Sequence, residues 1–179
     1  MILVTGGTRA GKSRVAQNIC AAVGPKVLYI ATAMTMDAFT AERFRRSRQQ
    51  RPYHWEIYKG FMDIGKEIDN VNGKYDAIMI ESLHSLVAEL LGNADFIRPG
   101  TPFRECEKKI MDEINLITTC ARRSSAVIVF VTTETAIFHA CADGAAQAAF
   151  EILGRVNQYV AAICAEVYLV VSGIPVKIK

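Results

Sequence analysis

Short apolar runs recur along the chain, separated by longer stretches in which apolar and polar residues mix. Each run places apolar side chains on both faces of an extended backbone, which is typical of parallel strands buried between helix layers. The runs predict strands at residues 2–5, 27–31, 77–80, 126–131 and 167–171. The mixed stretches predict helices at residues 12–23, 37–48, 83–91, 103–122 and 145–162. Among these helices, residues 103–122 show the repeat clearly, because Ile110, Ile114 and Ile117 recur at helical spacing.

The C-terminal end has a different pattern. Residues 166–171 and 174–178 read as two strands joined by a tight turn at Ser172 and Gly173. Pro175 suits an edge strand, where the missing N–H group costs little. We therefore expect an α/β three-layer sandwich, in which a mostly parallel sheet carries a C-terminal antiparallel edge pair.

Composition places the chain among globular proteins. Its 179 residues, 51% hydrophobic and 22% charged, predict a single domain spanning residues 1–179. The net charge of +3 is only mildly basic, so it suits an anionic small molecule and gives no reason to expect nucleic acid.

The apolar runs and the cysteines bear on location. No run is long enough to span a bilayer, so we expect no membrane insertion. The first run breaks at Gly6 and Gly7, unlike a secretory signal peptide. Five widely spaced cysteines fit buried thiols in a reducing compartment better than a disulfide framework. The sequence thus predicts a cytoplasmic protein.

A phosphate-binding motif lies between the first predicted strand and the first predicted helix. Residues 6–13 fit the pattern G-x-x-x-x-G-K-[ST], in the strand–loop–helix context that its mechanism needs. Gly6 and Gly11 allow successive N–H groups to converge on phosphate oxygens, and the helix N-terminus adds partial positive charge. Lys12 should reach the β- and γ-phosphates, and the Ser13 hydroxyl should bind Mg²⁺. The candidate nucleotide-binding residues are Gly6, Gly7, Thr8, Arg9, Ala10, Gly11, Lys12 and Ser13.

A second oxygen ligand for the metal is expected at the end of a buried strand. Glu81 ends the apolar run 77–80 at its carboxyl end, where ligands gather in open α/β sheets. Asp76 lies at the opposite end and reads as structural. We favour Glu81 as the partner of the metal or water over a helix-capping role, and it is also a candidate general base. The sequence contains no guanine-reading N-K-x-D element, so the cofactor is Mg²⁺ with either ATP or GTP.

Five arginines and a histidine are the remaining candidates. The arginines fall between residues 43 and 51, where a solvated helix face explains most of them. We favour a phosphate-binding role for Arg43, and a weaker case exists for Arg51. A lone histidine such as His54 is more often structural than catalytic.

Several motifs together resemble one family, the bifunctional adenosylcobinamide kinase/adenosylcobinamide-phosphate guanylyltransferases. The phosphate loop is similar to that family's loop, residues 29–33 (Y-I-A-T-A) resemble its second strand, and residues 51–55 resemble its R-P-x-x-W element. Residues 154–158 (G-R-V-N-Q) and 170–179 (V-V-S-G-I-P-V-K-I-K) resemble its closing motifs. The phosphate loop alone indicates a superfamily, whereas the ordered set is much more specific.

The resemblance implies a RecA-like P-loop fold, commonly a homotrimer, with two activities. A nucleoside triphosphate phosphorylates the aminopropanol hydroxyl of the corrinoid adenosylcobinamide. GTP then donates GMP to a histidine of the enzyme, and the phosphorylated corrinoid takes up that GMP. Imidazole suits this second step because it forms and releases a phosphoramidate readily.

The sequence departs from the family pattern at the guanylylated histidine. Counting back from Arg51, the family's histidine pair corresponds to Arg46 and Ser47. His54 would replace it only if the backbone brought His54 to the α-phosphate. Other departures fall at residues 133–136, at residues 147–151 and at Glu89, on segments expected near the ligand-bearing edge of the sheet.

Two hypotheses therefore stand. In the first, the chain is a family enzyme, with Lys12 and Glu81 serving the kinase step and His54 as the candidate for guanylyl transfer. In the second, it is a catalytically degenerate paralogue that binds nucleotide as a sensor or partner. An unrelated P-loop kinase of small metabolites would leave the closing motifs unexplained.

Overall fold

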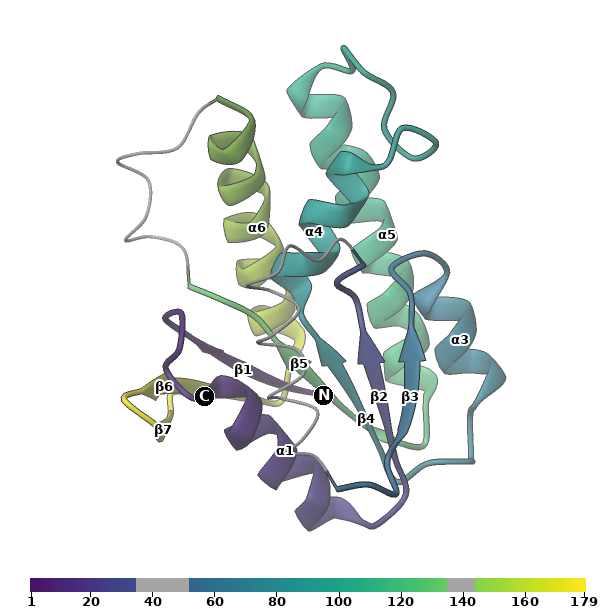
Figure 1. The fold of residues 1–179 in the computed structure, drawn as a ribbon, viewed down its shortest axis with the longest axis vertical. Helices are drawn as coiled ribbons and strands as arrows, with labels where there is room; N and C mark the ends of the chain where they lie inside the picture. Colours follow the sequence, from purple (N-terminus) through teal and green to yellow (C-terminus); the bar gives the residue numbers. More distant parts are fainter. Residues whose placement is uncertain (35–51, 135–143) are drawn as a thin grey trace.

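The computed structural model describes residues 1–34, 52–134 and 144–179. The predicted helix at residues 37–48 lies outside these ranges, as do Arg43, Arg46, Ser47 and Arg51. Within the described residues, the structure combines a seven-stranded sheet with helices on both faces (Figure 1).

The sheet is parallel except at one edge. Its strands follow the order β3-β2-β4-β5-β1-β6-β7, and only the β6–β7 pair is antiparallel. The strands are β1 (Ile2–Gly6), β2 (Val27–Ala31), β3 (Glu56–Lys59), β4 (Ala77–Glu81), β5 (Val127–Val131), β6 (Glu166–Val171) and β7 (Ile174–Lys177). The predicted α/β class, the mostly parallel sheet and the C-terminal antiparallel pair are all confirmed.

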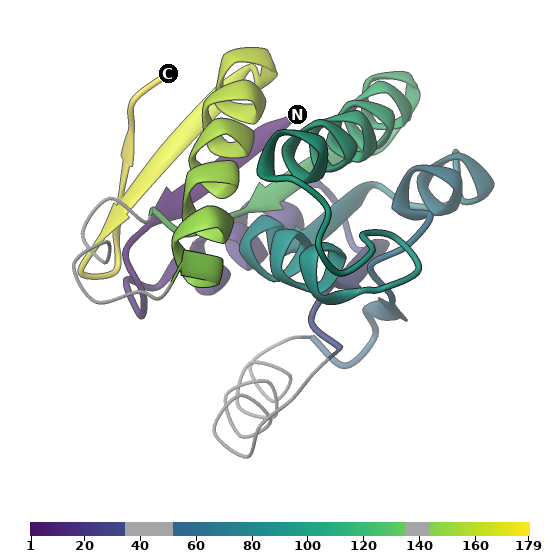
Figure 2. The same cartoon turned by 90° about the horizontal axis from the view of Figure 1, so that it is seen from above.

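The helices are divided unequally between the two faces of the sheet. The described helices are α1 (Lys12–Val23), α3 (Ile64–Asn70), α4 (Leu83–Gly92), α5 (Phe103–Arg123) and α6 (Gly144–Ile163). Helix α1 packs on one face, and the other four pack on the opposite face (Figures 1 and 2). The sheet is thus the middle layer of three.

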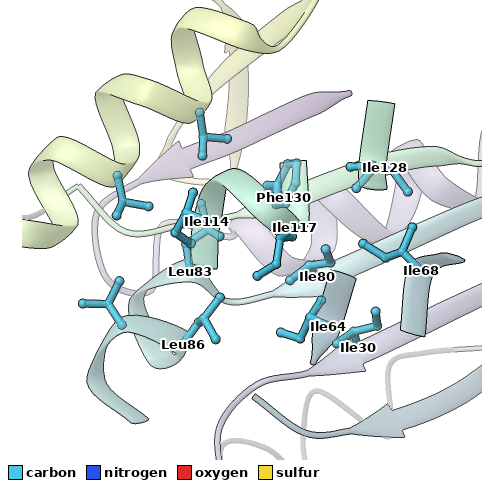
Figure 3. Close-up of a cluster of buried hydrophobic side chains, with 14 of the residues drawn as sticks. Ile30, Ile64, Ile68, Ile80, Leu83, Leu86, Ile114, Ile117, Ile128 and Phe130 are labelled. Carbon is cyan, nitrogen blue, oxygen red and sulfur yellow. The ribbon is translucent and has the colours of Figure 1, made fainter. Parts of the chain in front are cut away.

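Side chains alternate between the two faces of each central strand, so they fill both the interface with α1 and the interface with the other four helices. Ile30, Ile80 and Phe130 point to the four-helix side, where they join the large aliphatic cluster shown in Figure 3. Tyr29 and Met79 point to the α1 side. Because both sets are buried, the central strands β2, β4 and β5 read as continuous apolar runs, as the sequence predicted.

Two elements were missing from the sequence prediction. Strand β3 is short and almost wholly exposed, so it lacks the apolar run that marked the other strands. Helix α3 has seven residues, including Gly65, and only Ile64 and Ile68 give it a helical repeat. Both elements are too short or too polar to show a periodic pattern of apolar residues in the sequence.

The described cysteines behave as buried thiols. Cys20, Cys106, Cys120 and Cys164 are free and buried. Burial raises the pKa of Cys20 to about 12 and that of Cys164 to about 11. Neither thiol is therefore a ready nucleophile at neutral pH. No helix in the described part of the chain is long and apolar enough to cross a membrane.

Candidate phosphate- and metal-binding site

The predicted phosphate loop connects β1 to α1 at the carboxyl edge of the sheet. Gly6 has a φ of 146° and Gly11 a φ of 96°, which are conformations that favour glycine, as the sequence predicted. Lys12 opens α1 and is only 9% exposed. Its Nζ atom donates a hydrogen bond of 2.7 Å to the carbonyl oxygen of Gly7. The ammonium group is thereby held over the loop, where phosphates would be received.

The C-terminal hairpin supports this loop from the side, which the sequence did not reveal. The backbone N–H of Gly173 donates to the carbonyl oxygen of Ala10 at 2.8 Å. A Cβ atom on Gly11 would lie 3.2 Å from the Cα of Gly173, and one on Gly6 would lie 2.4 Å from the carbonyl oxygen of Val170. Val170 and Gly173 of the closing motif thus lie directly against the phosphate loop.

Glu81 meets the loop at its first helical turn. The hydroxyl of Ser13 donates to Oε1 of Glu81, and the hydroxyl of Tyr29 donates to Oε2 at 2.9 Å. Glu81 follows Met79 by two residues on β4, so alternation directs its side chain to the α1 side. The structure therefore brings Ser13 and Glu81 together, as expected, and adds Tyr29.

Asp76 and the cap of α4 both differ in position from Glu81. Oδ2 of Asp76 accepts the backbone N–H of Lys26 at 2.9 Å, at the opposite edge of the sheet. The cap of α4 is Ser82, whose hydroxyl accepts the backbone N–H of Ser85 at 3.1 Å. Glu81 is thus neither replaced by Asp76 nor used as a helix cap.

Hydrogen bonds connect polar residues at the carboxyl ends of β1 and β5 to other parts of the described chain. Thr132, after β5, donates to Oδ1 of Asn157 at 2.7 Å, and the amide of Asn157 donates to the carbonyl oxygen of Thr133 at 3.1 Å. Asn157 belongs to the G-R-V-N-Q motif, so that motif anchors the segment after β5. Thr5 contacts Oε2 of Glu134 at 3.4 Å, next to Gly6. None of these residues was predicted, because a threonine at a strand end gives no distinct sequence signal.

The other predicted residues include three more positions of the loop and His54. Thr8 and Arg9 are exposed on the loop, and Ala10 is half-buried. His54 is exposed and packs edge-on against Tyr53, with ring centroids 5.6 Å apart. It precedes the amino end of β3, four strands from β1, which is roughly 19 Å at about 4.8 Å per strand. The structure does not bring His54 to the phosphate loop.

Another histidine lies closer to this edge of the sheet. His84 is exposed in the first turn of α4, three residues after Glu81. The sequence reasoning gave it no role, although its position just after a buried strand was the available signal.

The donors at the site suit Mg²⁺. A hydroxyl and a carboxylate are the hard oxygen ligands that this ion prefers, and its remaining positions are usually filled by phosphates and water. The described residues contain no cluster of three or more histidine, cysteine or acidic side chains able to hold a metal. Ser13 and Glu81 could hold such an ion together with the phosphates of a nucleotide.

Comparisons with known proteins place the whole chain in one family. The family model for cobinamide kinase / cobinamide phosphate guanyltransferase matches residues 2–178. The bifunctional adenosylcobalamin biosynthesis protein CobU of Salmonella typhimurium is 38% identical over 183 residues, covering 100% of this chain and 99% of that protein. CobU of Escherichia coli is 37% identical with the same coverage. CobP of Pseudomonas aeruginosa is 24% identical, covering 99% of this chain and 96% of its own.

Proposed function

The chain belongs to the cobinamide kinase / cobinamide phosphate guanyltransferase family, and from this premise we propose that it acts on a corrinoid in the cytoplasm. A nucleoside triphosphate, ATP or GTP, phosphorylates the hydroxyl of the cobinamide side arm, and GMP is then added to the new phosphate. The convergence of Lys12, Ser13 and Glu81 at one loop is the observation that carries the kinase step.

The residues of the site divide the kinase work between them. Loop N–H groups from Gly6 to Ser13 and the N-terminus of α1 hold the phosphates. In this structure the ammonium group of Lys12 donates a hydrogen bond to Gly7. When a nucleotide binds, the same group turns to the β- and γ-phosphates. Ser13 and Glu81 would hold Mg²⁺, and a bound ion would supply positive charge to neutralise the transferring phosphoryl group. These roles make the loop both a binding and a catalytic element.

Guanylyl transfer needs a nucleophile that the described residues do not place at the loop. We retain His54 as the candidate from the sequence, although about four strand widths separate it from β1. His84 shares the carboxyl edge with Glu81 and is a second position to inspect. Arg43, a candidate phosphate ligand, and the positions corresponding to the family's histidines belong to residues 35–51, outside the described ranges.

One experiment separates these possibilities. The protein is incubated with Mg²⁺ and GTP, and acid-labile GMP adducts are mapped by mass spectrometry; cobinamide phosphorylation by ATP or GTP is measured in parallel. We expect phosphorylation together with an adduct. An adduct on His54 confirms that residue, and an adduct elsewhere replaces it. Phosphorylation without an adduct leaves a kinase alone. Nucleotide binding with neither reaction identifies a degenerate paralogue and overturns the proposal.

We propose in addition that the chain forms a homo-oligomer, a trimer by its family resemblance. The C-terminal hairpin carries four apolar side chains that are between 48% and 66% exposed: Val171, Ile174, Val176 and Ile178. Contiguous exposed apolar residues commonly mark protein interfaces. Light scattering of the purified chain tests the trimer, and a monomeric mass across the concentration range contradicts it.

A further inference from the structure

Tyr29, on β2, forms a hydrogen bond to the candidate metal ligand Glu81 at the end of β4. Glu81 has both carboxylate oxygens engaged: Oε1 by the Ser13 hydroxyl of α1, and Oε2 by the Tyr29 hydroxyl of β2 at 2.9 Å. The Tyr29 side chain is only 2% exposed. Glu81 is therefore held between a residue of the phosphate loop and a residue of the buried sheet.

The register explains how Tyr29 reaches Glu81. Strands β2 and β4 are parallel neighbours in which Tyr29 pairs with Met79 and Ala31 pairs with Glu81. Tyr29 and Glu81 are thus a diagonal pair on the same face, and such pairs come within reach of long aromatic side chains. Ala31, the register partner of Glu81, has only a methyl side chain.

A hydroxyl at this position calls for an explanation. On the α1 face, Tyr29 belongs to an otherwise apolar cluster that includes its register partner Met79, and phenylalanine would fill the same space. A buried hydroxyl carries a desolvation cost unless it is hydrogen-bonded. Since the hydroxyl is directed to the carboxylate at the edge of the phosphate loop, its role is best sought at that carboxylate.

We propose that Tyr29 is a positioning residue that orients Glu81 toward the Mg²⁺ of a bound nucleoside triphosphate. The proposal rests on the metal site assigned to Ser13 and Glu81 above. By occupying Oε2, the Tyr29 hydroxyl fixes the carboxylate plane and turns Oε1 toward Ser13. Carboxylates that bind metals are commonly held by such outer hydrogen bonds, whose loss weakens metal binding.

The test is Tyr29→Phe, with metal-dependent nucleotide binding as its readout. A fluorescent N-methylanthraniloyl derivative of GTP is titrated onto the protein in EDTA and across a series of Mg²⁺ concentrations. We expect the half-saturating Mg²⁺ concentration to rise about tenfold. Affinity in EDTA should stay within about twofold of the wild type, since no loop atom has been removed.

The matched control is Tyr75→Phe. The half-buried Tyr75 also donates a phenol hydrogen bond to a glutamate, at 2.7 Å to Oε2 of Glu56, but this bond is exposed and Glu56 begins β3 at the opposite end from the phosphate loop. The same atom is deleted, so any general effect of losing a phenol–carboxylate bond appears in both variants. We expect the Mg²⁺ dependence of Tyr75→Phe to equal that of the wild type. Thermal unfolding of each variant confirms that it is folded.

Each outcome decides a different point. Unchanged Mg²⁺ dependence in Tyr29→Phe overturns the positioning role and leaves the proposed function intact. Equal losses of affinity in EDTA and in Mg²⁺ show that Tyr29 supports the fold of the loop, which also overturns the proposal. If the wild type shows no Mg²⁺ dependence at all, the metal site itself is wrong, and the proposed function fails with it.

Discussion

The two faces of the central sheet are built from alternate residues of the same strands, yet they differ in chemistry. On β4, Ile78 and Ile80 enter the aliphatic cluster under α3 to α6, whereas Met79 and Glu81 face α1. On β2, Ile30 and Tyr29 divide in the same way. The four-helix side is packed with aliphatic groups, and the α1 side leads to the phosphate loop.

The difference shows where this fold accommodates polar side chains. On the α1 side, the hydroxyls of Tyr29 and Ser13 and the carboxylate of Glu81 satisfy one another at the carboxyl end of the strands. The face itself remains apolar until that edge is reached. Substitutions on the four-helix side should therefore change mainly the stability of the protein, and substitutions at the phosphate loop mainly its nucleotide binding. Four variants test this separation.

The largest expected effect comes from the aliphatic side. Phe130→Ala removes a fully buried ring from the four-helix side and leaves a cavity, so the free energy of unfolding should fall by about 3–5 kcal/mol. Urea denaturation measures the loss. Nucleotide affinity of the folded variant should change little, because Phe130 faces away from α1. A loss of affinity larger than tenfold in the folded protein would contradict the separation of the two faces.

Lys12→Ala tests the opposite side. Removing a buried ammonium group from the phosphate loop should weaken triphosphate binding by about 2–5 kcal/mol, since truncating one partner of a buried charge pair costs that much. Isothermal titration measures the affinity. Lys26→Ala is the control, because Lys26 is exposed and precedes β2 at the opposite edge of the sheet. Equal affinity in Lys12→Ala and the wild type would refute the phosphate-binding role of the loop.

Gly6→Ala examines the contact between the loop and the C-terminal hairpin. The new Cβ would lie 2.4 Å from the carbonyl oxygen of Val170, at a backbone φ of 146°, so the loop or β6 must shift. Strained backbone conformations of this kind cost about 1–3 kcal/mol. Thermal and urea unfolding measure the loss of stability, and nucleotide titration should show weaker binding as well.

Gly7→Ala is the matched control for Gly6→Ala. No atom lies within 4 Å of the position that its Cβ would take. Its stability should therefore stay close to that of the wild type, although both glycines belong to the same loop. If the two variants lose the same stability, the hairpin does not constrain the loop through Gly6.

The sequence predicted most of this architecture because its signals are periodic and local. Strand β2 and helix α1 have the predicted bounds, and the hairpin at Ser172 and Gly173 was expected from its turn residues. The phosphate loop could be recognised in the sequence because the spacing of its glycines, lysine and serine defines the motif. Strand β3 had no apolar run to reveal it, since it forms only by pairing with β2.

Site contacts between distant segments were harder to predict. Glu81 could be assigned to the ligand edge, because it ends a buried run. Its hydrogen bond to Tyr29 depends on which strands are neighbours and on their register, and no local pattern reports either property. The contact of Gly173 with Ala10 likewise requires β6 to lie beside β1. Sequence spacing locates the loop, whereas sheet order determines what surrounds it.

The smallest expected effect concerns a polar group on the four-helix side. Oε1 of Glu113, on α5, is buried and has no hydrogen-bond partner among the described residues. Burial, with a smaller contribution from the negative charge of Asp63, raises the pKa of this carboxyl above its ordinary value of 4.5, and Lys66 offsets part of the shift. Glu113 therefore destabilises the fold when it is charged.

Glu113→Gln should stabilise the protein at neutral pH by less than about 1 kcal/mol, since the side chain is only half-buried. A raised folded-state pKa means that the cost of ionisation is absent below pH 4.5 and grows as pH rises through the folded pKa. The stability gain over the wild type should therefore be largest at pH 7.5 and shrink toward pH 4.5. Urea denaturation across this range measures it. A gain that grows as pH falls would show that Glu113 is favourably ionised in the fold, and the contrast with the α1 side would then fail at this position.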